Sequence, residues 1–423
     1  MLRGVAWVGL AFLAAGACSS TADPDDEAYG RIVFTVRHGP VPSTPPVDSV
    51  TVHVEPTDDG SLTTVTAGTV FPVGADSVRL PVEVPMASDV AGLLFTVQLL
   101  AGGATAFETR SRGSVRRGAE TEVPPIVPAT WEPLVAGSGP GPLEEAALAH
   151  APALGGTVLF GGLTPTGNDG STWIFDGAAW TAAQLSGTTP PGRHGHFMAF
   201  DDSRSEIVMF GGRVTSIAPV GDTWILGTGG WAQAQPATSP PARTAHAMAY
   251  DRRHRLVLLF GGMSINGPLD DTWAWDGTSW QATGQNARPD ARSGHTLVWS
   301  PLRRRVILFG GRALDGVRSD VWEWDGTQWQ PRELQGAIPA RWEHAVGWDE
   351  GRGRMVVLGG VQVAGVPLGD VWELVDDRWM FVNHTVRPGA RFGAAMVDAG
   401  AEGVFLFGGR DTEGFLDDLW RYR

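Results

Sequence analysis

The sequence predicts an all-β protein in which one unit of four short strands is repeated six times. The first observation behind this prediction is a set of glycine pairs, each closing an apolar run, at steps of 50, 50, 49, 49 and 49 residues. The second is a tryptophan that follows each pair after 11 or 12 residues. The third is a stretch before the repeats that lacks this period and shows short alternating strands instead.

The repeated unit is clearest between Arg243 and Trp280. Its expected strands are 247–251, 256–260 and 272–276, followed by one that opens at Trp280. The second of these is apolar throughout, as expected of a strand covered on both faces. The turn signal Asp276-Gly277 predicts a hairpin between the third and fourth strands.

The same landmarks recur along the chain. The glycine pairs are Gly161 and Gly162, Gly211 and Gly212, Gly261 and Gly262, Gly310 and Gly311, Gly359 and Gly360, Gly408 and Gly409. The third-strand tryptophans are Trp173, Trp224, Trp273, Trp322, Trp372 and Trp420. With a period of about fifty residues and four strands per unit, the chain resembles the kelch family over roughly its last seventy per cent. The resemblance implies a six-bladed kelch-type β-propeller, similar to the central domain of galactose oxidase.

The two ends of the repeat region predict how the ring closes. The sixth repeat ends after its third strand, at Trp420, and has no fourth strand. Trp131 lies 49 residues before Trp180 and so has the register of a fourth strand. We therefore expect a propeller over residues 129–423, whose last blade is completed by the strand of Trp131.

The N-terminus is expected to direct export and lipid anchoring. Residues 1–18 combine Arg3, a short apolar segment and small residues that end at Cys18, and they resemble a bacterial lipoprotein signal. An ordinary cleavage site with an incidental cysteine is the alternative. Diacylated Cys18 would anchor the chain to a membrane, with residues 19–28 as a flexible acidic tether. Because Ser19 follows the cysteine, resemblance to Gram-negative lipoproteins implies the outer membrane, on its periplasmic side or at the cell surface.

Residues 29–128 are predicted to form a small β-sandwich, immunoglobulin-like in architecture. Six or seven short strands separated by turn-forming clusters support this prediction. We identify no chemistry in this segment, which is either a spacer or a second binding module.

Composition excludes several classes of function. The net charge is −14 and the chain contains no lysine, which argues against a nucleic-acid partner. Cys18 is the only cysteine, so disulfides and a cysteine-crosslinked copper oxidase site are excluded. The chain has no phosphate-binding loop, zinc-ligand spacing or nucleophile elbow. We therefore expect no cofactor, no metal and no catalytic residue.

An Arg-x-x-His motif precedes the expected innermost strand in four repeats. Its members are Arg193 and His196, Arg243 and His246, Arg292 and His295, Arg341 and His344. One interpretation is that these side chains bind a ligand at the channel mouth. The other, which repetition favours, is that they belong to the structural framework. Aspartates next to the third-strand tryptophans, such as Asp271 and Asp320, are expected to be buried partners or turn caps.

Residues that break the repeat are the other candidates. Trp342 and Phe392 stand where other repeats have His194, Thr244 and Ser293. Aromatic side chains beside arginine suit carbohydrate stacking or a protein hot spot, and local packing is the alternative. Arginines in the first-to-second loops form a further possible basic surface, or else solvated turn charges.

The leading prediction is a recognition module at the cell envelope that binds an envelope protein or glycan. By family resemblance, the second-to-third loops and the channel mouth form the binding face. The alternatives are a carbohydrate-active enzyme similar to sialic-acid mutarotases, using arginine and histidine at the channel mouth, and a structural scaffold in an envelope complex. We expect a monomer.

Overall fold

The structure is a computed structural model. It describes residues 29–37, 48–56, 65–71, 77–85, 90–101, 104–116, 120–126, 129–135, 137–185, 187–283, 287–362, 365–382, 384 and 386–423. The predicted signal segment, Cys18 and the tether lie outside the described residues. In the described part of the chain, no helix has the length and apolarity needed to cross a bilayer.

The first compact unit contains two sheets. One sheet has the order β4 (Ser77–Pro85), β1 (Tyr29–Arg37), β7 (Glu120–Ile126). The other has the order β3 (Val65–Val70), β2 (Ser49–Pro56), β5 (Val90–Ala101), β6 (Ala104–Arg116). Phe34 of the first sheet and Phe95 of the second are buried edge to face, with ring centroids 5.0 Å apart. The immunoglobulin-like architecture stays a prediction.

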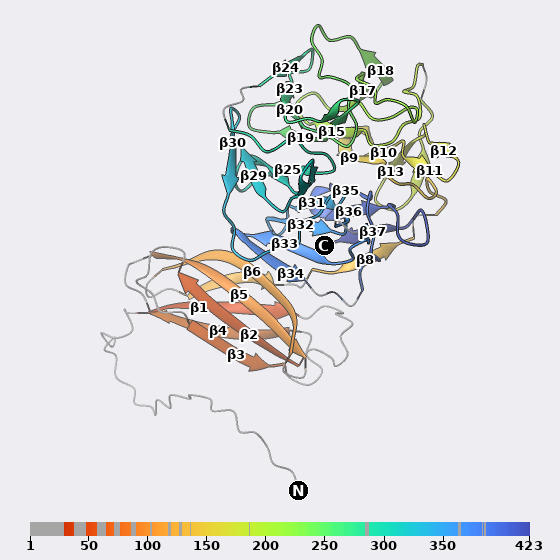
Figure 1. Cartoon of the computed structure of the whole chain (residues 1–423). Coiled ribbons are helices and arrows are strands. Elements are labelled where there is room, and N and C mark those ends of the chain that lie inside the picture. Colours follow the sequence, from red (N-terminus) through yellow and green to blue (C-terminus); the bar gives the residue numbers. More distant parts are fainter. Residues whose placement is uncertain are drawn as a thin grey trace, which may run out of the picture. The chain divides into compact units, whose positions relative to one another are not determined.

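The second unit contains six antiparallel four-stranded sheets, called blades 1 to 6 here (Figure 1). From inner to outer strand, blade 1 is β9 (Ala147–Ala151), β10 (Gly156–Phe160), β13 (Thr172–Phe175), β14 (Trp180–Ala182), and blade 2 is β15 (Phe197–Asp201), β16 (Glu206–Phe210), β17 (Thr223–Gly227), β18 (Gly230–Ala234). Blade 3 is β19 (Ala247–Asp251), β20 (Leu256–Phe260), β23 (Thr272–Trp275), β24 (Trp280–Ala282), and blade 4 is β25 (Thr296–Ser300), β26 (Arg305–Phe309), β29 (Val321–Trp324), β30 (Trp329–Arg332). Blade 5 is β31 (Ala345–Asp349), β32 (Arg354–Leu358), β33 (Val371–Val375), β34 (Arg378–Val382), and blade 6 is β35 (Ala395–Asp398), β36 (Val404–Phe407), β37 (Leu419–Tyr422), β8 (Trp131–Leu134).

The blades are arranged in a closed ring. Each inner strand contacts the inner strands of the next and the preceding blade, in the order β9, β15, β19, β25, β31, β35 and back to β9. Short hairpins extend the second-to-third loops of three blades: β11 (Leu163–Thr164) with β12 (Gly167–Asn168), β21 (Met263–Ser264) with β22 (Gly267–Pro268), and β27 (Arg312–Ala313) with β28 (Gly316–Val317). Two 3-10 turns, η2 (Pro152–Leu154) and η3 (Gly400–Glu402), connect the first two strands of blades 1 and 6.

Blade 6 combines the two ends of the propeller. Its outer strand β8 pairs with β37, and Trp131 lies opposite Tyr422. The ladder continues through the amide of Thr130, which donates to the carbonyl of Arg423 at 2.9 Å. Trp131 is 2% exposed, and its ring centroid lies 4.8 Å from that of Tyr422. The Trp131 strand therefore holds the position that its register predicted.

Aromatic side chains fill the wedges between blades. The fourth-strand tryptophan of each of blades 1 to 5 packs on the phenylalanine that ends the second strand of the preceding blade, with ring centroids 5.0–5.5 Å apart. The pairs are Trp180 on Phe407, Trp231 on Phe160, Trp280 on Phe210, Trp329 on Phe260, and Trp379 on Phe309. Because each tryptophan fills a wedge that recurs once per blade, its period follows the period of the fold.

Candidate functional site

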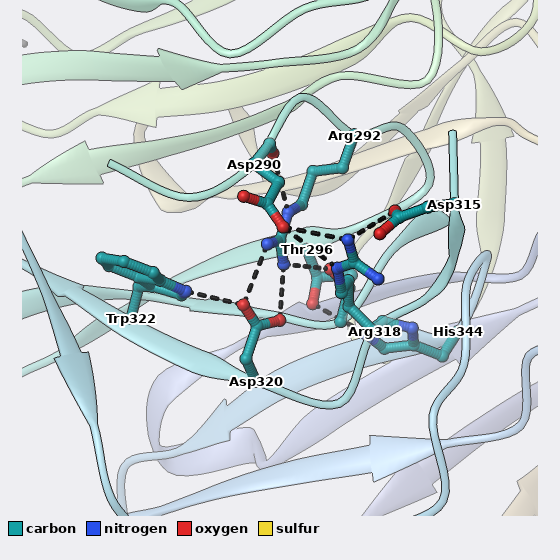
Figure 2. Close-up of polar contacts among 9 residues, drawn as sticks. Asp290, Arg292, Thr296, Asp315, Arg318, Asp320, Trp322 and His344 are labelled. Carbon is teal, nitrogen blue, oxygen red and sulfur yellow. Dashed lines mark hydrogen bonds and ion pairs between the residues drawn. The ribbon is translucent and has the colours of Figure 1, made fainter. Parts of the chain in front are cut away.

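The repeated arginines are held inside the blades. Arg292 donates from both terminal nitrogens to the carboxylate of Asp320, at 2.6 and 2.9 Å, and also to the carbonyls of Gly310 and Asp290 (Figure 2). The indole nitrogen of Trp322 donates to the same carboxylate at 2.7 Å. The arrangement recurs in four further blades, as Arg193 with Asp222, Arg243 with Asp271, Arg341 with Asp370, and Arg391 with Asp418.

This geometry corrects one of the predicted binding sets. The side chains of Arg193, Arg243, Arg292 and Arg341 have no exposed surface, so they cannot contact a ligand at the channel mouth. Although burial by itself raises the pKa of Asp320, the guanidinium of Arg292 and the indole of Trp322 lower it below its usual value. The framework interpretation therefore applies to the arginines, and the aspartates are their partners.

The four histidines are also buried, and they line a cavity on the propeller axis. Each ring meets, edge to face, the phenylalanine that ends the second strand of the preceding blade: His196 and Phe160, His246 and Phe210, His295 and Phe260, His344 and Phe309. The glycine pairs leave room for them, since a Cβ on Gly212 would lie 2.7 Å from the Cβ of His196. Burial lowers the pKa of His196 and of His295 to about 3, so both imidazoles are neutral at physiological pH.

Trp342 and Phe392 are half-buried on the face of the second-to-third loops. The guanidinium of Arg312 lies over the Trp342 ring, 5.4 Å from its centroid. Both residues form backbone bridges, Trp342 with Val361 and Phe392 with Arg410, so each also packs within its own blade. Ligand contact by these two side chains stays a prediction.

The axial cavity has a volume of 270 Å³, and the inner strands of all six blades line it. Its wall is apolar and includes Met198, Met248 and Leu297. At the end where the inner strands finish, Phe200 and Trp299 stand beside the polar side chains His150, Asp202, Arg252 and Asp398. Burial raises the pKa of Asp398 to about 6.

A ring of six backbone hydrogen bonds surrounds the other end of the cavity. Each member donates its amide to the carbonyl of the preceding blade's member at 2.8–3.1 Å, and the members are Glu145, Gly195, Ala245, Gly294, Glu343 and Gly393. All six have φ between 50° and 64°, in the left-handed region. Four of them are glycine or alanine and two are glutamate. The sequence analysis missed these glutamates. The sequence does contain a signal for one of them. The residue before the repeated histidine is glycine or alanine in blades 2, 3 and 4, whereas in blade 5 it is Glu343.

The arginines of the first-to-second loops do not form a free basic surface. Arg303 pairs with Asp377 at 2.6 Å, and Arg354 pairs with the buried Glu373 at 2.7 Å. Arg252 lies 3.3 Å from Asp202, while Arg204 and Arg352 pair with the aspartate three residues before them. Acidic side chains therefore neutralise most of this set. Across the described residues, no group of three histidine, cysteine, aspartate or glutamate side chains is placed to hold a metal ion.

Together, the closed ring of four-stranded blades and the repeated Arg–Asp–Trp framework define a kelch-repeat β-propeller. Residues 146–325 match the family model described as the KLHDC2/KLHL20/DRC7 Kelch-repeats domain. The solved structure of YjhT superimposes with a TM-score of 0.55 at 14% sequence identity, over 68% of this chain and 98% of that one. No curated protein matches the sequence. The chain is thus a kelch-repeat β-propeller protein, and the likeness to YjhT shows the fold alone.

Proposed function

We propose that this protein is a cell-envelope lipoprotein whose propeller acts as a recognition module for a protein or glycan. The binding face is the one formed by the second-to-third loops and the adjacent channel mouth. The proposal is supported by the fold, since kelch propellers are commonly protein-binding modules. The envelope location rests on the resemblance of residues 1–18 to a lipoprotein signal.

The exposure of four loop side chains supports the choice of the second-to-third loop face. Four consecutive blades, 2 to 5, each present one exposed aliphatic side chain on the second-to-third loop. These are Ile217, Ile265, Leu314 and Val366, with exposures of 84, 72, 88 and 62%. Because all four lie on the same kind of loop, the face of the second-to-third loops carries one exposed apolar side chain in each of these blades, which favours this face as the interaction surface. The half-buried Trp342 and Phe392 lie on the same face and extend it towards the channel.

The enzyme alternative loses the side chains on which it depended. The four arginines are buried in ion pairs, and the four histidines are packed against phenylalanine. The scaffold alternative predicts no ligand for this face. A binding experiment therefore separates scaffold from recognition module.

Replacing Leu314 with serine is expected to weaken binding to the partner by about tenfold, which corresponds to about 1.4 kcal/mol. The protein would be screened against purified envelope proteins and glycans, and the affinity of any ligand would be measured by titration calorimetry. Leu302→Ser is the matched control, because Leu302 is 70% exposed but lies in a first-to-second loop. Equal losses in the two variants, or no ligand at all, would contradict the proposed face.

Replacing Cys18 with alanine is expected to release the protein from the membrane fraction. Two acyl chains on Cys18 would anchor the chain durably, and the substitution removes their attachment point. The measurement is fractionation of cells that express the variant or the unchanged protein. Retention of the variant in the membrane fraction would refute the lipid anchor.

A further inference from the structure

The axial cavity has apolar side chains exposed to it along its length. Val298, Val346 and Met396 lie inside the inner strands β25, β31 and β35, yet each keeps part of its surface exposed. An inner strand has its own blade on one edge and a neighbouring blade on each side, so this surface can only face the axis. Exposed apolar side chains that line one cavity indicate a site for an apolar ligand.

The shape of the cavity limits what this ligand can be. The inner strands of blades 1 to 5 have five residues each, which makes the cavity about 16 Å long. Its volume of 270 Å³ equals that of about nine water molecules in the liquid. The apolar wall offers water few hydrogen bonds, so water is a poor occupant. A volume of this size spread over that length suits one extended chain better than a bulky ring system.

The two ends of the cavity are closed in different ways. On the side of the second-to-third loops, each member of the backbone ring is hydrogen-bonded to both of its neighbours, so widening this end breaks main-chain hydrogen bonds. At the other end, the side chain of Arg252 crosses the opening. It starts from blade 3, lies 3.3 Å from Asp202 of blade 2 and reaches within 3.9 Å of Glu350 in blade 5.

The end at Arg252 is therefore the one through which a ligand can enter. Arg252, Asp202 and Glu350 are 49, 44 and 45% exposed. Because exposed ion pairs contribute little to stability, the arginine side chain can move aside at small cost. Below it, the partly exposed rings of Phe200 and Trp299 continue the apolar wall up to the opening.

Charges at this opening select the head group of the ligand. Asp202, Glu350 and Asp398 surround it, and Arg252 faces them. Three carboxylates against one guanidinium repel an anionic head group, while a cationic head group competes with Arg252 for the carboxylates. A head group without net charge, such as a hydroxyl, leaves the ion pairs intact and can donate a hydrogen bond to a carboxylate.

We propose that the axial cavity binds one unbranched alkyl chain whose head group has no net charge, and that the chain enters at Arg252. Burial of the chain against the apolar wall supplies the affinity, and the narrow cavity selects against cyclic molecules. This site lies at the opposite end of the propeller from the face of the second-to-third loops. The inference thus goes beyond the recognition function proposed above and does not depend on it.

The same alkyl chemistry has two sources, a free alcohol and the acyl chain of a membrane lipid. The probes are therefore decanol and decanoyl lysophosphatidylcholine, with cyclodecanol as the control for shape and decanoate as the control for charge. Each would be titrated by calorimetry into the full-length Cys18→Ala chain, purified without detergent, because this variant cannot carry acyl groups on Cys18. We expect decanol to bind at one saturable site, and cyclodecanol and decanoate to bind at least about tenfold more weakly.

Two variants locate the site and its entrance. Val346→Trp fills the cavity and is expected to lower decanol affinity by about tenfold or more, whereas Val135→Trp, at a position that is 97% exposed, should not change it. Arg252→Ala is expected to speed the association of decanol, measured by stopped-flow tryptophan fluorescence, because Trp299 lies at the opening. This substitution removes a half-exposed side chain and leaves the fold intact, so it tests the site even if Val346→Trp does not fold.

Each outcome decides the source or overturns the inference. Binding of the lysophospholipid as well as decanol assigns the acyl chain of a lipid, and binding of decanol alone assigns a small alcohol. The inference is wrong if decanol does not saturate one site, if cyclodecanol or decanoate binds equally well, or if Arg252→Ala leaves the association rate unchanged. Leu314→Ser should keep full decanol affinity, so failure of the loop face and failure of the cavity are told apart.

Discussion

Replacing Asp320 with alanine is expected to lower the free energy of unfolding by about 3–5 kcal/mol. The substitution leaves the guanidinium of Arg292, which has no exposed surface, without its anionic partner. The carbonyls of Gly310 and Asp290 still accept hydrogen bonds from it, but they carry no compensating charge. The indole of Trp322 loses its acceptor at the same time.

The matched control is Asp270→Ala, which also removes an aspartate paired with an arginine in a neighbouring loop. Asp270 and its partner Arg288 are both about two-fifths exposed, with 2.8 Å between the charged atoms. Because water solvates both charges, the expected loss is only about 0–1 kcal/mol. Urea denaturation followed by tryptophan fluorescence measures both values. Similar losses of unfolding free energy in Asp320→Ala and Asp270→Ala would show that the burial of Arg292 does not make its ion pair more important for stability than an exposed one.

The pH dependence of this framework has a defined sign. The folded protein holds the pKa of Asp320, and of its four counterparts in the other blades, below the usual value. A carboxyl with a lowered pKa contributes stability above its unfolded pKa, and that stability is lost as the pH falls through the folded value. Glu145 and Glu343 have raised values and act in the opposite sense, destabilising the fold as the pH rises above about 4.5.

The blades could be predicted from the sequence because each one is a local unit. The strands expected at 247–251 and 256–260 are β19 and β20 of the structure, and the third and fourth strands begin at Thr272 and Trp280 as expected. Arg292 and Asp320 were both recognised as repeated polar residues. Their pairing was not predicted, because 28 residues separate them and no local pattern says which carboxylate a buried arginine meets.

The candidate site was less accessible to sequence analysis because it is assembled from all six blades. The residue before each repeated histidine contributes one member of the ring, and its left-handed backbone becomes visible only in three dimensions. Glutamate at two of these positions then changes from an ordinary polar residue into a half-buried side chain on a left-handed backbone. The same holds for Arg303, whose partner Asp377 belongs to the next blade and lies 74 residues away.

Deleting Trp131–Leu134 is expected to cause the largest loss of stability of any change considered, because it removes the strand that closes the ring. Truncation of a buried tryptophan alone costs about 3–5 kcal/mol, against a total stability of about 5–15 kcal/mol for a typical domain. The deletion also leaves β37 as an open edge, without its ladder to β8. We expect a markedly lower melting temperature and a less cooperative transition. Glu132→Ala is the control: it removes the partly exposed ion pair with Arg421 but keeps the strand.

Amide hydrogen exchange can test whether the loss comes from ring closure rather than from core volume alone. If β8 closes the ring, its removal should lower the protection of β37 and β36 first, because blade 6 becomes an unsupported terminal blade. Blade 5 should follow, since the hydroxyl of Tyr422 in β37 donates to the buried carboxylate of Glu373 at 2.6 Å. Blade 3 lies on the opposite side of the ring and should keep its protection longest. A uniform loss of protection in blades 3 and 6 would contradict closure by β8. Without β8, blade 6 should unfold before the rest of the ring.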